Sequence, residues 1–350
     1  MKRSNAAKFA AVAAAGVLAL TACDNAADDG ASGGGDGETS SDVKVGLAYD
    51  VGGRGDRSFN DSAYRGLEQA AEELGVETND FEPADGEAES AKEERLATMA
   101  EEGYDVIIAV GFAYDAAVQA VAPEYPEVDF AIVDSEIEDI DNVTSLVFAE
   151  EQASFLAGAA AALTTDEDHV GYIGGVETPL IRKFEAGYVA GVAHVNEDIE
   201  VEINYLSQPP DFAGFNDPAQ GREAAQAQYD RGADVIYHAA GASGNGILQS
   251  AVDNEFTFIG VDSDQYENAE EEQKPYVLTS AIKQVDVSVF ELIRSATEGD
   301  VEAGIKRFDL SEGGVDYTLT NEEAIAPIQD QLDELKQQII DGEIEVPSQP

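Results

Sequence analysis

The chain has 350 residues, and its 72 acidic residues against 19 basic ones give a formal net charge of −53 at pH 7. A charge this negative argues against nucleic acid and against anionic lipid surfaces as partners. Because the chain contains a single cysteine, an intramolecular disulfide, a thiolate metal cluster and a CxxC redox site are excluded.

The first residues predict export. Three basic residues precede an apolar run from Phe9 to Leu20, and the letters LTAC occupy positions 20–23. A run of 12 residues is too short for a permanent membrane helix, which takes about 20, so residues 1–22 are expected to be a signal peptide. The letters LTAC are typical of a lipobox, so Cys23 is expected to be acylated and to anchor the chain. A plain signal peptide cut elsewhere is the alternative.

Residues 24–42 predict a flexible tether, because they are mainly glycine, serine and acid and can bury almost nothing. Together with Cys23 they form the segment 23–42. The folded part then begins near Val43, and its 308 residues suit two lobes of about 100 to 200 residues each.

From Val43 onward, short apolar runs alternate with amphipathic stretches, which predicts parallel strands joined by helices. In the first half we expect strands at 43–50, 105–111, 129–134 and 143–149, with helices at 60–74, 89–102 and 115–122. In the second half we expect strands at 169–175, 201–207, 234–241 and 257–262, with helices at 151–163, 180–196, 218–231 and 244–254.

The last part of the chain is expected to divide between the two lobes. A strand at 276–283, a helix at 285–298 and a strand at 305–310 are assigned to the first lobe, and an acidic helix at 322–340 to the second. The expected fold is therefore α/β, with two Rossmann-like parallel-sheet lobes joined by a hinge that the chain crosses several times. Lobe 1 would comprise 43–148 plus 263–310, and lobe 2 would comprise 149–262 plus 311–350.

Ligands of open α/β sheets bind at the carboxyl ends of the strands, and the loops found there contain two aromatic residues. Phe59 and Phe215 stand in otherwise polar loops, where a flat heterocycle could stack between them. The alternative is that both rings fill the interiors of their own loops.

Polar candidates stand in the same loops. Carboxylates at Asp56, Asp115 and Asp262 can accept hydrogen bonds from paired hydroxyls or ring N–H groups, and Asn60 can both donate and accept. Asp56 has an alternative role as the cap of the following helix. Lys283 can pair with Asp262 and donate to a ligand oxygen, its alternative being an ordinary surface lysine.

The loop from Gly241 to Gly246 is a further candidate, because its backbone N–H groups can approach an oxygen at a helix start. It lacks the Gly-Lys-Ser/Thr of a phosphate loop, so it is weak evidence for a nucleotide.

Six pieces of the chain, in order, resemble the basic membrane protein (BMP) family of nucleoside-binding lipoproteins, of which the purine nucleoside receptor is the described type. These pieces are 56–60 (DRSFN), Gly111-Phe112 with Asp115, 151–158 (EQASFLAG), 184–188 (FEAGY), 215–218 (FNDP) with Gly221, and 260–265 (GVDSDQ). The resemblance covers nearly all of the chain after the signal peptide. The lysine-rich surface of the family is replaced here by acid, while the loop motifs are kept.

This resemblance implies a type I periplasmic-binding-protein fold and a monomer that delivers a nucleoside to an ABC transporter permease, with no cofactor and no metal. It implies the following sites: the base between Phe59 and Phe215, its edge bonded to Asn60 and Asp115, and the ribose bonded to Asp262 and Lys283 with Gly241 nearby. Asp56 is carried over as a further ligand residue.

An enzyme is the first rival interpretation, and the residue inventory argues against it. His169, His194 and His238 lie in separate expected elements without HExxH spacing, and no GxSxG elbow occurs. No dedicated base is available to activate a water for nucleoside hydrolysis.

Two further rivals share the expected fold. A nucleoside sensor that signals through a partner would use the same loops, so uptake and sensing both remain open. A sugar-binding protein would also use rings and carboxylates, but its usual stacking residue is tryptophan, which this chain lacks. That absence modestly favours a nucleoside.

The acidic residues are spread along the chain, which indicates a surface adapted to high salt. Because the Debye length shrinks to about 3 Å at 1 M salt, self-repulsion should be relieved there, and we expect the melting temperature to fall when the protein is desalted. Calorimetry in low and molar salt measures this, with an uncharged osmolyte as control. Equal melting temperatures would contradict the interpretation.

Overall fold

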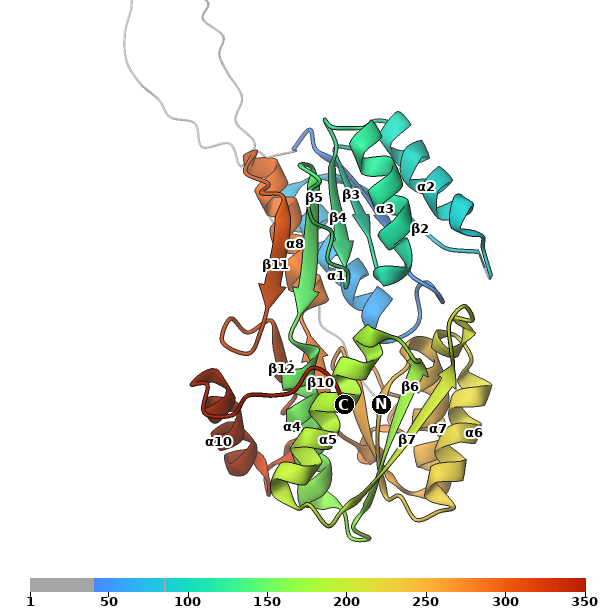
Figure 1. The fold of residues 1–350 in the computed structure, drawn as a ribbon, viewed down its shortest axis with the longest axis vertical. Helices are drawn as coiled ribbons and strands as arrows, with labels where there is room; N and C mark the ends of the chain where they lie inside the picture. The colour runs from blue at the N-terminus through green and yellow to red at the C-terminus, as the bar shows by residue number, and fades with distance from the viewer. Residues whose placement is uncertain (1–40, 85) are drawn as a thin grey trace, which may run out of the picture. The chain divides into compact units, whose positions relative to one another are not determined.

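Two six-stranded sheets organise the part of the chain that the computed structural model describes, residues 41–84 and 86–350 (Figure 1). The expected signal peptide, Cys23 and the tether up to residue 40 lie outside the described residues. Both sheets belong to one compact unit. We call the first sheet and its helices lobe 1, and the second sheet and its helices lobe 2.

The first sheet has the strand order β11-β5-β4-β3-β1-β2, and all neighbouring strands are parallel. Its strands are β1 (Lys44–Ala48), β2 (Glu77–Phe81), β3 (Val106–Ala109), β4 (Asp129–Val133), β5 (Val143–Phe148) and β11 (Gly304–Phe308), and its helices are α1 (Phe59–Leu74), α2 (Glu89–Glu101), α3 (Asp115–Val121) and α8 (Val285–Glu298). Alternate residues of β3 join different apolar clusters, Ile108 with α1 and α8, and Ile107 with α2 and α3. Helices therefore cover both faces, which is why the four central strands β1, β3, β4 and β5 are largely buried and apolar, whereas the edge strands β2 and β11 are partly exposed and polar.

The second sheet has the order β12-β10-β9-β8-β6-β7, parallel except for β12. Its strands are β6 (His169–Val176), β7 (Glu200–Ser207), β8 (Val235–Ala239), β9 (Thr257–Asp262), β10 (Val277–Lys283) and β12 (Val315–Tyr317). The helices that follow or cover these strands are α4 (Glu150–Thr164), α5 (Pro179–Val195), α6 (Pro218–Tyr229), α7 (Gly244–Asn254), α9 (Glu322–Ile325) and α10 (Gln329–Ile340). Short 3₁₀ turns are η1 (Phe112–Tyr114), η2 (Ala122–Glu124), η3 (Ala213–Phe215), η4 (Gly241–Ser243) and η5 (Lys274–Tyr276).

The expected fold class is confirmed, but strands β2 and β12 were not predicted, and the helix expected at 322–340 is divided into α9 and α10. One expected lobe assignment is also wrong. The strand expected at 276–283 in lobe 1 is β10, which pairs with β9 and β12 and therefore belongs to the second sheet. The chain returns to the first sheet only after Lys283, through α8 and β11. An apolar strand does not reveal which sheet it joins, because its burial pattern is the same in either.

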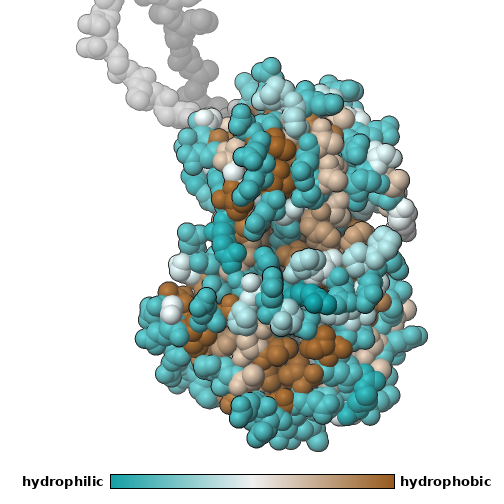
Figure 2. Space-filling view, in the orientation of Figure 1, coloured by the Kyte–Doolittle hydropathy of each residue, from teal (hydrophilic) through white to brown (hydrophobic). Residues whose placement is uncertain are grey.

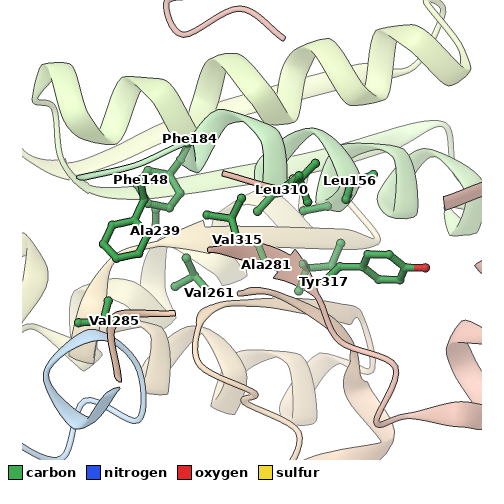
Figure 3. Close-up of a cluster of buried hydrophobic side chains, with 14 of the residues drawn as sticks. Phe148, Leu156, Phe184, Ala239, Val261, Ala281, Val285, Leu310, Val315 and Tyr317 are labelled. Carbon is green, nitrogen blue, oxygen red and sulfur yellow. The ribbon is translucent and has the colours of Figure 1, made fainter. Parts of the chain in front are cut away.

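Among the described residues the chain passes between the sheets three times, after β5, after β10 and after β11. At two of these passages the rings of Phe148 and Phe308 are stacked, with centroids 5.2 Å apart. One apolar cluster runs through this region from lobe 1 into lobe 2. Figure 3 shows part of it, with Phe148, Phe184 and Ala239 at one end and Leu156 and Tyr317 at the other.

The face of the molecule seen in Figure 2 is largely hydrophilic, with several apolar areas between the polar ones. Among described residues the exposed large apolar side chains are Tyr229, Val287, Ile305, Leu319 and Ile340. No helix in the described part of the chain is both long enough and apolar enough to span a membrane.

Helices α4 and α5 lie side by side (Figure 1) and approach closely because small residues face each other. A Cβ atom on Gly158 would clash with the carbonyl oxygen of Tyr188, and one on Gly187 with that of Glu151. A Cβ atom on Gly191 would likewise clash with the carbonyl oxygen of Phe155. Glycine therefore sets the spacing of this helix pair.

Gly191→Ala should push the two helices apart and lower the free energy of unfolding by about 1 to 3 kcal/mol, as measured by urea denaturation. Ala193→Ser, on the exposed side of the same helix, is the control and should change it by less than about 0.5 kcal/mol. A Gly191→Ala protein as stable as the parent would disprove the close contact.

Candidate functional site

A cavity of about 50 Å³ lies where the carboxyl ends of strands from both lobes meet. Arrowheads of β5 and β11 in one sheet and of β6 in the other point toward this level in Figure 1. Seven of the eight predicted ligand residues line the cavity: Asp56, Phe59, Asn60, Phe215, Gly241, Asp262 and Lys283. The structure thus brings together loops that are far apart in the sequence, while the role of these residues in binding stays a prediction.

Asp115 is the predicted residue that does not line the cavity. It is the first residue of α3, and its carboxylate accepts hydrogen bonds from Ser135 Oγ and Gln119 Nε2, both at 2.5 Å. Phe112, three positions earlier in the same loop, lines the cavity instead. The structure thus brings this loop to the cavity but places Phe112 there in place of Asp115, the residue that the sequence predicted.

Asp56 lines the cavity but its carboxylate is already engaged. It accepts the backbone N–H groups of Ser58, Asn60 and Asp61 at 2.8–3.1 Å, just before and within the first turn of α1. These bonds are those of a helix cap, the alternative role considered for this residue. Burial raises the pKa of Asp56 to about 7, although the three donors act to lower it.

The side chain of Asn60 is held at one end. Its Oδ1 atom accepts the backbone N–H of Asp50 at 3.0 Å, which fixes the orientation of the amide. The Nδ2 group is therefore the end that can donate to a ligand.

The cavity contains more aromatic residues than the strand-end loops predicted. Phe112 lies edge-on to Phe215, with ring centroids 6.2 Å apart, and Phe184 of α5 also lines the cavity. Phe184 belongs to the FEAGY piece of the resemblance, but it lies within α5 and therefore lacks the strand-end position that marks the predicted ligand residues. It comes from the first turns of a helix, where Leu180 and Ile181 also line the cavity.

Lys283 is buried in the polar part of the site. Its Nζ atom donates to Asp134 Oδ2 at 2.6 Å, while Asp262 Oδ1 is at 3.8 Å and Glu150 Oε1 at 3.9 Å. Burial alone would lower the pKa of Lys283, but attraction to these three carboxylates outweighs burial and raises it. The lysine is therefore charged, and its expected pairing with Asp262 is secondary to the one with Asp134.

Sequence reasoning missed Asp134 and Glu150. Asp134 directly follows β4 as Asp262 ends β9, so the same strand-end signal was present. Glu150 begins α4 and is 2% exposed, and neither of its carboxylate oxygens has a hydrogen-bond partner. Burial raises the pKa of Glu150 to about 7, while Lys283 and Lys183 act to lower it.

The electrostatics favour a ligand rich in donors. Four carboxylates, from Asp50, Asp56, Asp134 and Asp262, line the cavity with a single lysine.

Within the described ranges no three or more His, Cys, Asp and Glu side chains are grouped to hold a metal ion. His238 is buried away from the cavity, where its Nε2 atom meets Gln265 and burial lowers its pKa to about 4.

Three larger cavities share lining residues with the first, one of them, of about 370 Å³, through Asp262. Another of about 390 Å³ shares Asp50 and Val51 with the first, and one of about 320 Å³ shares Phe112, Asp134 and Leu180. Small-molecule sites usually enclose about 300–1,000 Å³, so a ligand of that class needs the walls of the central cavity to move apart.

The family model for the "ABC transporter substrate-binding protein PnrA-like" proteins, named Bmp, matches residues 43–350. The chain belongs to the Bmp family. It is therefore a substrate-binding protein of an ABC transporter, as the loop resemblance implied.

Named relatives of this Bmp protein agree with the assignment. The chain is 35% identical to the "ABC transporter nucleoside-binding protein BmpA" of Lactococcus lactis over 97% of each chain. It is 33% identical to an uncharacterized lipoprotein of Pyrococcus abyssi, over 79% of this chain and 69% of that one. A solved ABC transporter solute-binding protein from Aeropyrum pernix is 29% identical with a TM-score of 0.75, over 87% of this chain and 93% of that one.

The buried carboxyl of Glu150 predicts a pH dependence of stability. Its pKa is raised to about 7 by burial, above that of an unfolded glutamate, so the folded state binds the proton more tightly. Its contribution is complete below pH about 4 and is lost as pH rises through about 7. Between these two pH values, the free energy of unfolding of the parent should therefore fall by about 1 to 3 kcal/mol more than that of Glu150→Gln.

Urea denaturation at pH values from 4 to 8 measures this difference. The exposed Glu312→Gln is the matched control and should follow the parent. Parallel stability curves for the parent and Glu150→Gln would rule out a titrating Glu150.

Proposed function

We propose that this chain is an extracytoplasmic lipoprotein that binds a purine nucleoside between its two lobes and presents it to the permease of an ABC transporter. The observation that carries the proposal is the convergence of Phe59 and Asn60 from lobe 1 with Phe215, Asp262 and Lys283 from lobe 2 on one cavity. These residues combine apolar rings with a few polar groups, as small-molecule sites do.

The chemistry of a nucleoside suits both parts of the cavity. A purine is flat, apolar on its faces and polar at its edge, so Phe59 and Phe215 can contact the faces while Asn60 bonds the edge. Ribose carries vicinal hydroxyls, for which the carboxylate of Asp262 is an acceptor and the ammonium of Lys283 a donor. The phenylalanines of the cavity and the absence of tryptophan favour a base over a sugar.

The charge of the cavity favours a nucleoside over a nucleotide. A phosphate would face four carboxylates and could pair with one lysine, which already contacts Asp134. At short range in a partly dry site such repulsion amounts to several kcal/mol. A neutral ligand with many donors avoids this cost.

Ligand entry requires the lobes to separate. A central cavity of about 50 Å³ does not admit a nucleoside, and the three passages of the chain between the sheets suit a rigid-body opening about a hinge. Opening would join the central cavity to the larger cavities beside it.

The anchor is proposed from the sequence and the relatives. The letters LTAC at 20–23 and the lipoprotein name of the Pyrococcus relative support acylation of Cys23. The tether of 24–42 would let the folded part reach a permease in the same membrane.

Titration calorimetry tests the ligand class. The chain from Asp24 onward is refolded to remove carried-over ligand and titrated in molar salt with adenosine, guanosine, inosine, cytidine, uridine, ribose and glucose. Purine nucleosides should bind with micromolar or tighter affinity, about −8 kcal/mol or better, and the sugars should not bind. Sugar binding with silent nucleosides would move the function to the sugar class.

Variants test the site itself. Phe59→Ala removes a stacking ring and Asp262→Ala removes a hydroxyl acceptor, so each should weaken nucleoside binding by more than about tenfold, or 1.4 kcal/mol. Asp115→Asn is the control, because Asp115 lies outside the cavity and should leave affinity unchanged. Normal affinity in both cavity variants would refute the site.

A further inference from the structure

Two cavity residues of lobe 2, Asp262 and Lys283, are the last residues of two neighbouring strands. Asp262 is the last residue of β9 and Lys283 the last of β10, and Asp262 is aligned with Ile282 in the parallel register. The side chains of both residues are at most 8% exposed. Each of them is bonded to a residue of lobe 1.

Ser58 of lobe 1 bonds to Asp262. Its Oγ atom donates to Asp262 Oδ2 at 2.6 Å, and Ser263 Oγ donates back to the carbonyl of Ser58 at 2.7 Å. Ser58 is fully buried, and its own N–H group is held by Asp56 at 2.9 Å. The hydroxyl is therefore fixed within lobe 1 while it contacts lobe 2.

Asp134 of lobe 1 bonds to Lys283. The 2.6 Å contact is much shorter than the distances from Lys283 Nζ to Asp262 or Glu150. The ammonium also lies 4.6 Å from the ring centroid of Phe59 and 5.5 Å from that of Phe184. These rings exclude water, so the pair is buried and depends on its partner for charge compensation.

The backbone supports a functional origin for these contacts. Asp134 and Asp262 have φ angles of 66° and 62°, in the left-handed region, and Arg57, just before Ser58, has a φ angle of 56°. Non-glycine residues in this region are uncommon and cluster at ligand sites, where the surrounding structure holds them. Here that conformation occurs at Asp134 and Asp262, the two carboxylates of the cavity that contact the opposite lobe.

We propose that Ser58 and Asp134 are positioning residues that reach across from lobe 1 and orient Asp262 and Lys283 of lobe 2, so that the polar part of the site is complete only when the lobes are closed. The inference rests on the proposed function for the identity of the ligand, but not for the closure. The second oxygen of Asp134, Oδ1, has no hydrogen-bond partner and its residue lines the cavity, so it can also accept a ligand hydroxyl.

Such contacts hold a bound ligand in place rather than attract it. Encounter takes place with open lobes, before the cross-lobe bonds form, whereas release requires these bonds to break. Loss of Ser58 Oγ or of the Asp134 charge should therefore act mainly on the dissociation rate, where most affinity differences between related complexes lie.

Stopped-flow binding of the tightest purine nucleoside tests the rates. Ser58→Ala and Asp134→Asn should each raise the dissociation rate by about tenfold or more and change the association rate by less than about threefold. Ser58→Thr, which keeps the hydroxyl, should restore the parent rate. Unchanged dissociation rates in both variants would overturn the proposal.

Matched controls lie within lobe 1. Ser62→Ala removes another buried hydroxyl of α1, one that accepts the backbone N–H of Asp286 in α8, and Asp129→Asn changes the acid at the opposite end of β4. Both should keep the parent dissociation rate. A similar increase in these controls would show a general loss of rigidity and would overturn the cross-lobe assignment.

A second readout needs no ligand. Because the chain from Asp24 has no cysteine, Ala88→Cys in lobe 1 and Ala219→Cys in lobe 2, both exposed, allow a dye to be placed on each lobe for energy transfer. Ser58→Ala and Asp134→Asn should shift the population toward the open form, and the lobe 1 controls should not.

The energy-transfer measurement distinguishes failure of the proposed ligand from failure of the proposed positioning role. Absence of nucleoside binding together with a shifted open population would reject the proposed ligand and keep the positioning role. Nucleoside binding with unshifted populations and parent dissociation rates would keep the ligand and reject the positioning role. Thermal unfolding of each variant verifies folding, and Ser58→Ala carries the test by itself if Asp134→Asn does not fold.

Discussion

The buried ammonium of Lys283 constrains the arrangement of the two lobes more than any other single group. Removing a charge from water costs several kcal/mol, which must be offset by nearby opposite charge and by good geometry. The compensation comes from the ends of β4, β9 and α4, which lie in different lobes. The strand ends of both sheets must therefore meet at this point, and the cavity lies where they meet.

The need to compensate the charge of Lys283 also explains why the cavity is acidic. This cause differs from the one that makes the surface acidic. Surface carboxylates of this chain are screened by salt, whereas those of the cavity are in contact with a buried cation and with backbone donors. Asp56 holds the start of α1 and Asp134 holds Lys283. A neutral, donor-rich ligand fits such an environment, because the carboxylates that organise the protein still have oxygens able to accept.

Apolar contacts hold helices together within lobe 2 and also connect the two lobes. Glycines set the close contact between α4 and α5 in lobe 2. Where the chain passes between the lobes, the stacked rings of Phe148 and Phe308 belong to a cluster shared by both lobes. The lobes thus share apolar contacts where the chain passes between them and polar contacts at the cavity. The polar contacts are directional, and they lie where a ligand would bind.

The alternation of apolar runs and amphipathic stretches by itself determined two largely parallel sheets, because burial on both faces leaves a local pattern in the central strands, whereas the polar edge strand β2 left none. It also located seven of the cavity residues, since carboxyl ends of parallel strands share one edge. Only the tertiary structure decided that β10 joins the second sheet, that Phe112 rather than Asp115 faces the cavity, and that Asp134 holds Lys283. Periodicity reports how deeply a residue is buried, whereas its partner depends on strand pairing and on local backbone angles such as the φ of 66° at Asp134, which no local pattern specifies.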